Sequence, residues 1–212
     1  MTTETPNNTD RLLETLATIL MAVATVATAW CAYQSTVFGS VQEFDLHEAD
    51  VLNRQVNSLR IKSFQRSMID VQLFTNWANA VGTDKPELAA YYETLFTPRM
   101  KPAFNAWKAL DPLNNPSAPR HFFFMKEYVV EDDVQADSLQ AVYGTRLAKA
   151  GESNSHSEHY ILLTVVFASV LFFGGITSNL KSIPTKTALV AGSALLLIGS
   201  VIWMLTFPMI IR

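Results

Sequence analysis

The sequence predicts an all-α membrane protein with three transmembrane helices. The first and second are expected to continue into a long antiparallel helical hairpin with a small aromatic-rich helical tip. Three observations predict this fold. Three long stretches contain no charged residue, apolar residues recur at steps of three and four after the first stretch, and the aromatic residues concentrate in residues 74–128.

The charge-free stretches are residues 15–42, 160–180 and 187–211. A hydrocarbon core of about 30 Å requires roughly 20 apolar helical residues, and each stretch is long enough. The overall hydrophobic content of 49% does not separate membrane from soluble proteins, so the distribution carries the prediction. The predicted segments are a disordered tail (1–10), a first transmembrane helix (11–38), an extracytoplasmic helical stalk and tip (39–158), a second transmembrane helix (159–180), a cytoplasmic loop (181–186) and a third transmembrane helix (187–211).

A cleaved signal peptide is the main alternative for the first charge-free stretch. The preceding residues include Glu4, Asp10 and Glu14 against one basic residue, so the basic start of a signal peptide is missing. The apolar run also exceeds the roughly 7–15 residues of a typical signal core. The sequence therefore favours a retained helix, in which the single cysteine, Cys31, is expected to pack as a small apolar residue.

Charge next to the spans predicts the orientation in the membrane. Lys181 and Lys186 lie in the short connection between the second and third spans, and short basic loops tend to stay cytoplasmic. The residues after the first span are acidic from Glu43 to Asp50. We therefore expect a multi-pass membrane protein with a cytoplasmic N-terminus, extracytoplasmic residues 39–158 and an external Arg212.

The outgoing helix is expected to run past the first span to a stop at Gly82, because no strong helix breaker precedes this glycine. A next helix is expected to begin at Pro86 with Asp84 as its N-cap, and the return helix near Glu127. The predicted core-facing residues of the outgoing helix are Val41, Phe44, Leu52, Val56, Leu59, Ile61, Phe64, Met68, Val71, Phe74, Ala78 and Val81.

Eleven aromatic residues fall within residues 74–128, about half of those in the chain. Aromatic side chains bury large apolar areas, so this concentration predicts a small folded core at the tip of the hairpin. The residues are Phe74, Trp77, Tyr91, Tyr92, Phe96, Phe104, Trp107, Phe122, Phe123, Phe124 and Tyr128.

His156 and His159 are the candidate metal ligands, since they share one helical face. In an antiparallel hairpin His156 is expected to face residues 34–38, and His47 residues 143–146. The two groups therefore stay apart within one chain. The sequence predicts no metal site, no cofactor and no catalytic residue, and the histidines are interpreted as polar residues at the membrane boundary.

Other enzyme classes find no support in the sequence. No nucleophile elbow, phosphate-binding loop or dinucleotide fingerprint is present, so we expect no enzyme activity. Carboxylates such as Asp70, Asp132, Asp133 and Asp137 are explained as charged faces of long helices. The charge-free stretches offer no ionisable side chain for ion-coupled transport. The basic residues within 99–126 form no dense run, which favours a solvated rim over a docking site.

Small residues in the spans predict close packing between helices. Such residues let backbones approach within a membrane, and three spans are few for a solitary bundle. We therefore expect a homo-oligomer or a larger membrane complex. The predicted packing residues are Gly174, Gly175, Gly192, Ser193, Gly199 and Ser200.

The sequence resembles a family of uncharacterised bacterial three-span membrane proteins, known only as a domain of unknown function. The resemblance covers residues 25–180, and it implies a bacterial inner membrane protein with the same layout and no assigned site residues. The matching stretches are Ala29-Trp30, Tyr33-Gln34, Ile69–Trp77, Glu87-Leu88-Ala89 with Tyr92, Arg99, Pro102–Trp107, Asp111–Pro116 and Phe167–Ile176.

These observations predict a membrane-anchored structural or assembly protein that packs with itself or with a larger membrane complex. The alternative is an oligomeric channel or a transporter accessory subunit, with the threonine-bearing first span lining a pore. A metal-dependent enzyme or sensor using His156 and His159 is a third hypothesis. The expected partners are the lipid bilayer and membrane proteins, with no nucleic acid.

Overall fold

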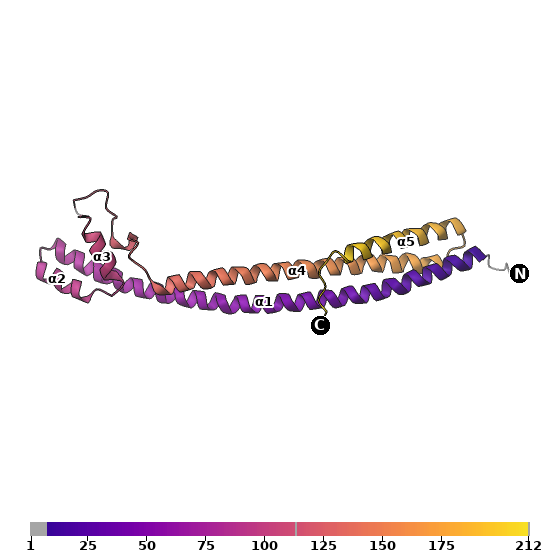
Figure 1. The fold of residues 1–212 in the computed structure, drawn as a ribbon, viewed down its shortest axis with the longest axis horizontal. Helices are drawn as coiled ribbons and strands as arrows, with labels where there is room; N and C mark the ends of the chain where they lie inside the picture. Colours follow the sequence, from indigo (N-terminus) through magenta and orange to yellow (C-terminus); the bar gives the residue numbers. More distant parts are fainter. Residues whose placement is uncertain (1–7, 113, 212) are drawn as a thin grey trace. The chain divides into compact units, whose positions relative to one another are not determined.

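In a computed structural model of the chain, the described residues are 8–112 and 114–211. These residues form five α-helices and one short 3-10 helix, without a β-strand, which confirms the all-α class (Figure 1). The elements are α1 (Asn8–Gly82), α2 (Pro86–Leu95), α3 (Met100–Lys108), η1 (Phe122–Phe124), α4 (Glu131–Thr177) and α5 (Ile183–Met204).

Helices α1, α4 and α5 are long and apolar enough to cross a membrane, which indicates a membrane protein. Helix α1 runs without a break to Gly82, where the sequence predicts its end. The predicted disordered tail falls largely on residues 1–7, which lie outside the described residues, as does Arg212. Residues 8–10 of that tail already belong to α1.

The chain divides into two compact units. Unit 1 comprises Met1–His47 and Arg146–Arg212, and unit 2 comprises Glu48–Thr145. Unit 1 therefore holds the charge-free stretches, while unit 2 holds the short helices α2, α3 and η1. Helices α1 and α4 contribute residues to both units.

In unit 1, α1 packs against α4 and α5 through residues seven positions apart. Those of α1 are Ala17, Ala24, Cys31, Phe38 and Asp45, and all are buried. A seven-residue step returns an α-helix to nearly the same face after two turns, which is the spacing of packed helix pairs. Three of them share a core with Phe167 of α4 and Leu197 of α5. The expected packing of Cys31 as a buried small residue is confirmed.

The predicted third span is too long. Helix α5 ends at Met204, and residues 205–211 continue without helical structure. Pro208 lacks a backbone N–H and does not extend a helix, so this segment requires other hydrogen-bond partners. Gln34 is fully buried and supplies two of them: its Nε2 donates to the Ile210 carbonyl at 3.0 Å, and its Oε1 accepts from the Ile210 amide at 3.1 Å. The Tyr160 hydroxyl donates to the Pro208 carbonyl at 3.0 Å.

The predicted loop between the last two spans also ends too late. Lys186 lies in the first turns of α5 and is buried. Its Nζ donates to Asp10 Oδ1 at 2.6 Å and to Glu14 Oε1 at 3.0 Å. A buried ammonium needs such partners, because an unpaired charge removed from water is unfavourable. Helix α5 is thus tied to the start of α1.

In unit 2, the predicted apolar face of α1 is confirmed only in part: Val56 is buried, and Phe74 and Ala78 pack against a buried aromatic cluster. Ile61, Phe64 and Met68 are exposed. Five residues that α1 buries in this unit are again seven apart, Ala49, Val56, Ser63, Asp70 and Trp77, and Ala80 is buried as well. Small or polar side chains hold three of the five positions, at Ala49, Ser63 and Asp70. Between Asp45 and Ala49 the step is four, a shift that changes the phase of a seven-residue repeat.

Arginines of α1 pair with carboxylates of α4 inside unit 2. The Arg60 guanidinium lies 2.6 Å from Asp137 and 3.0 Å from Asp133, and Arg66 lies 2.6 Å from Asp132. Later residues of α1 meet earlier residues of α4, so the two helices are antiparallel in this unit. The hydrogen bonds to Asp137 and then Asp133 raise the pKa of Arg60, which stays charged. These aspartates are ion-pair partners rather than a merely solvated face.

The predicted aromatic core is present in unit 2. Trp77, Phe96, Phe104, Trp107 and Phe122 are buried in one cluster with Met100 and three alanines. Rings meet mostly edge to face, as in the pair of Trp77 and Phe104 at 4.8 Å and 82°. Phe74, Tyr92, Phe123 and Tyr128 pack around this cluster, and Tyr91 and Phe124 are exposed.

Two predicted helix starts differ from the structure. Asp84 is not an N-cap: its φ of 55° places it in the turn after α1, and Lys85 precedes α2 without a capping side chain. Helix α4 begins at Glu131 rather than near Glu127. The first turn of α4 carries Glu131, Asp132 and Asp133, where negative charge favours the helix dipole.

Candidate functional site

Asp70 of α1 is the most completely engaged carboxylate in unit 2. It is fully buried. Its Oδ1 accepts from the Thr97 hydroxyl at 2.8 Å, and its Oδ2 accepts from Arg99 Nε at 2.7 Å and from the Tyr128 hydroxyl at 2.9 Å. Arg99 also donates through a second nitrogen to the Arg66 carbonyl at 2.7 Å. The interpretation of Asp70 as part of a charged surface is therefore wrong.

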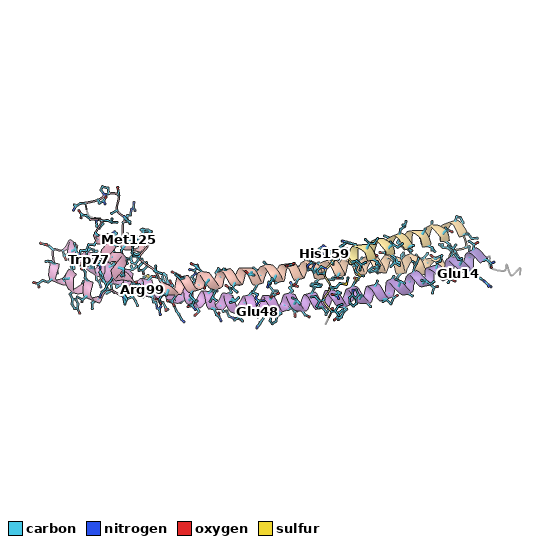
Figure 2. The ribbon with its side chains drawn as sticks, viewed as in Figure 1. Glu14, Glu48, Trp77, Arg99, Met125 and His159 are labelled. Carbon is cyan, nitrogen blue, oxygen red and sulfur yellow. The ribbon has the colours of Figure 1, made fainter. Side chains whose placement is uncertain are left out.

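Local sequence places these donors around Asp70. Thr97 and Arg99 come from the turn between α2 and α3, where the Met100 amide donates to the Thr97 hydroxyl at 3.3 Å. Figure 2 shows Arg99, Trp77 and Met125 among the elements of unit 2. With both oxygens occupied by donors, the carboxylate has the environment of a structural ion pair rather than that of a reactive base.

Tyr128 completes the arrangement around Asp70. Burial raises the pKa of its phenol above the ordinary value of 10.0, and the hydrogen bond to Asp70 raises it further. The hydroxyl also lies 3.4 Å from the Ser67 hydroxyl. Tyr128 therefore remains a neutral donor across the physiological range.

The candidate metal ligands His156 and His159 have separate surroundings in unit 1. The His156 ring lies 5.1 Å from Phe38, so its predicted position opposite residues 34–38 is confirmed. Its Nε2 lies 3.8 Å from Glu152. His159 Nδ1 lies 2.6 Å from the Ser155 carbonyl, and its ring packs on Phe207 at 4.9 Å. Among the described residues, no group of three or more His, Cys, Asp or Glu side chains is placed to hold a metal ion.

The predicted packing residues divide into two groups. A Cβ added at Gly174 would lie 2.7 Å from Met21 Cγ, so Gly174 serves close approach of α4 to α1. Ser193 and Ser200 are buried, and the Ser200 hydroxyl donates to the Leu197 carbonyl at 3.0 Å. Gly175, Gly192 and Gly199 face open space, since a Cβ there would meet nothing within 4 Å.

A second face of α1 was missed in the sequence. In unit 1 it is made of small residues with exposed side chains: Thr15, Thr18, Ala22, Thr25, Ala29, Ala32 and Thr36. Ala22 and Ala29 stand two residues before the buried Ala24 and Cys31, and Thr25 and Ala32 stand one residue after them. The spacing of three and four residues was the signal that could have revealed this face.

Further along α1, the same offsets hold large apolar residues beside Ser63 and Asp70, but polar residues beside Ala49 and Val56, namely His47, Asp50, Arg54 and Asn57. Ile61, Phe64, Met68 and Val71 are exposed by 58%, 66%, 49% and 37%. They hold the same offsets, two before and one after the buried Ser63 and Asp70. Together these two sets of residues define the outer face of α1. In the described part of the chain, the large apolar side chains of this face are exposed.

In comparisons with known proteins, no family model, no curated protein and no solved structure matches the chain. The candidate site is therefore defined by the contacts and exposure of this chain's own residues. The candidate site is the outer face of α1, together with the open glycines of α5.

Replacing Asp70 by Asn should lower the free energy of unfolding by about 3–5 kcal/mol, because Arg99 then loses its buried counter-charge. Chemical denaturation of the detergent-solubilised chain measures this. Asp50→Asn removes an exposed carboxylate that lies 3.5 Å from Arg54, and it should change stability by less than about 1 kcal/mol. Equal effects of the two changes would contradict the central role of Asp70.

Tyr128 should make stability depend on pH in the alkaline range. Its pKa is raised on folding, so its contribution is complete below pH 10 and is lost as the pH rises through the folded-state value. Tyr128→Phe removes the ionisation. The difference in Tm between wild type and this variant should therefore be constant below about pH 10 and shrink as the pH rises above it. A difference that stays constant with pH would count against a buried neutral phenol.

Proposed function

We propose that the protein is a membrane-anchored structural or assembly protein that packs with itself or with a larger membrane complex. The observation that carries this proposal is the outer face of α1. It keeps one position relative to the buried residues of each unit, and its spacing suits a helix as the partner.

Within the first span, the outer face favours close helix contact. Its threonine hydroxyls donate to carbonyls of the same helix, as in Thr18 to Glu14 and Thr25 to Met21, both at 2.8 Å. Small side chains with satisfied hydroxyls leave a smooth surface for van der Waals packing in lipid. Since the hydroxyls are occupied, they support packing better than they support the alternative of a polar pore lining.

In unit 2, the outer face offers apolar side chains to water if this unit lies outside the membrane. A row of exposed apolar residues such as Ile61, Phe64 and Met68 marks an interaction surface on a soluble part of a protein. Lys62 is exposed on the same part of α1, whereas Arg54 and Arg66 already pair with Asp50 and Asp132. A helix with an apolar face would match this surface.

Helix α5 supplies a second surface for assembly. Gly192 and Gly199 lie seven residues apart and are open to close approach. Exposed Leu195, Ile198 and Ile202 surround them. This combination of small and branched residues suits docking of another transmembrane helix.

The proposal includes a location in the bacterial inner membrane, with the N-terminus in the cytoplasm and residues 39–158 outside. The resemblance to bacterial three-span proteins supports the location. Lys181 supports the orientation as a basic residue between two spans, whereas the charge of Lys186 is balanced by Asp10 and Glu14.

Loss of the outer face should weaken assembly without unfolding the chain. Ile61→Ser with Phe64→Ser should shift the complex toward monomer by about tenfold in apparent dissociation constant, because two exposed anchors are lost. Native mass spectrometry and light scattering of the protein in nanodiscs measure the distribution. Val134→Ser, at an equally exposed position of α4, is the matched control.

A wild-type chain that is monomeric at every concentration and carries no co-purifying protein would overturn the assembly proposal. Gly199→Leu separates the two surfaces. If α5 contributes, this variant should also lower the assembled fraction, while the circular dichroism of the helices stays unchanged.

The orientation can be tested by labelling cysteines in intact cells. In a Cys31→Ser background, a cysteine at the exposed Ser58 should react with a membrane-impermeant maleimide, and one at the exposed Ser178 should react only after lysis. The reverse pattern would invert the proposed orientation. It would leave the assembly proposal intact.

A further inference from the structure

Unit 2 contains a cleft of about 530 Å³ between the end of α1, helix α2 and the end of α3. Trp77, Val81, Ala89 and Trp107 contribute apolar walls. This volume lies in the usual range of small-molecule pockets, about 300–1,000 Å³, and such pockets combine apolar walls with a few polar groups. The cleft shares no residue with the outer face of α1.

The charges that line the cleft are not balanced. Glu93 Oε1 accepts from Trp77 Nε1 at 3.0 Å and from Lys108 Nζ at 2.7 Å, so Glu93 and Lys108 neutralise each other. The other charged residues that line the cleft are Asp84, Asp111 and Lys85, and their charges sum to one negative charge. In the part of the chain that the structure describes, neither aspartate forms an ion pair with a lysine or arginine, and Asp111 accepts from Asn114 Nδ2 at 3.1 and 3.2 Å.

The backbone at both aspartates would ordinarily favour glycine. Asp84 has φ 55° and Asp111 has φ 48°, and they are the only non-glycine residues with positive φ among those described. Each stands shortly after a helix end, where glycine adopts this conformation without a Cβ penalty. Glycine at these two positions would relieve the backbone, but the cleft would then lose both carboxylates.

We propose that this cleft binds an ammonium group carried on an apolar body. The two aspartates would attract the ammonium group, and the apolar body would lie against the walls formed by Trp77 and Trp107. Favourable electrostatics with aromatic walls is a common way to recognise organic cations. The ligand is either a free amine or a lysine side chain of a peptide, because both present the same group. The site is independent of the proposed assembly.

Titration calorimetry of the full chain in nanodiscs tests the site, with empty nanodiscs as the blank. Phenethylamine should bind saturably, and 2-phenylethanol and phenylacetate should bind at least about tenfold more weakly, because they lack the positive charge. Quenching of tryptophan fluorescence provides a second readout from Trp77 and Trp107. No saturable binding of phenethylamine up to 10 mM (roughly the weak limit of specific recognition) would overturn the proposal, as would equal binding of the alcohol.

Variants at the two aspartates separate charge from folding. Asp84→Asn and Asp111→Asn keep side chains that tolerate positive φ, and each should weaken phenethylamine binding by about three- to tenfold. Asp84→Gly with Asp111→Gly should abolish binding while the Tm stays equal or rises, because glycine relieves the backbone. Glu87→Gln is the matched control on an exposed carboxylate of α2 that does not line this cleft. Unchanged affinity in the double glycine variant would overturn the proposal.

The source of the ammonium group is resolved by comparing two ligands. Acetyl-Phe-Lys-amide binding more tightly than phenethylamine would assign the site to a lysine of a partner peptide. The opposite order would assign it to a free amine, and both orders support ammonium recognition. Native mass spectrometry of the same preparation reports assembly separately, so the two proposals fail independently.

Discussion

The burial of one charge, on Asp70, organises unit 2. A carboxylate removed from water requires donors on both oxygens, and Thr97, Arg99 and Tyr128 supply them from segments on either side of α3. These contacts hold the α2–α3 turn and the segment before α4, which contains Tyr128, against α1. The aromatic cluster and the cleft therefore have a fixed frame, since their walls come from the same segments.

The helical class, the three long apolar helices and the aromatic core were predictable, because each depends on how much apolar surface a segment carries. Charge-free stretches long enough for a bilayer and eleven aromatics in a short segment leave few alternatives to spans and a small core. The packed face of α1 in unit 2 was not predictable in this way. Periodicity selects the most apolar row, which contains Ile61 and Phe64, whereas the structure buries Ser63 and Asp70.

The candidate site was only partly accessible to sequence reasoning. Small residues indicate where helices can approach, but they do not show which side of a helix its own chain already covers. Gly174 is used inside the chain, and Gly192 and Gly199 are not. The positive φ of Asp84 was also hidden, because aspartate shortly before a proline-started helix is an ordinary N-cap candidate. Contacts of neighbouring elements decide between these cases.

Gln34 has a consequence for biogenesis. Its amide is satisfied by Ile210, which is synthesised 176 residues later. Until residue 210 has been synthesised, this polar group therefore lacks its final partner, and a buried amide without a hydrogen bond is costly. Lys186 reaches Asp10 and Glu14 across 176 and 172 residues. The first half of α1 thus depends on α5 and the residues after it, so the contacts of unit 1 are complete only after residue 210 has been synthesised.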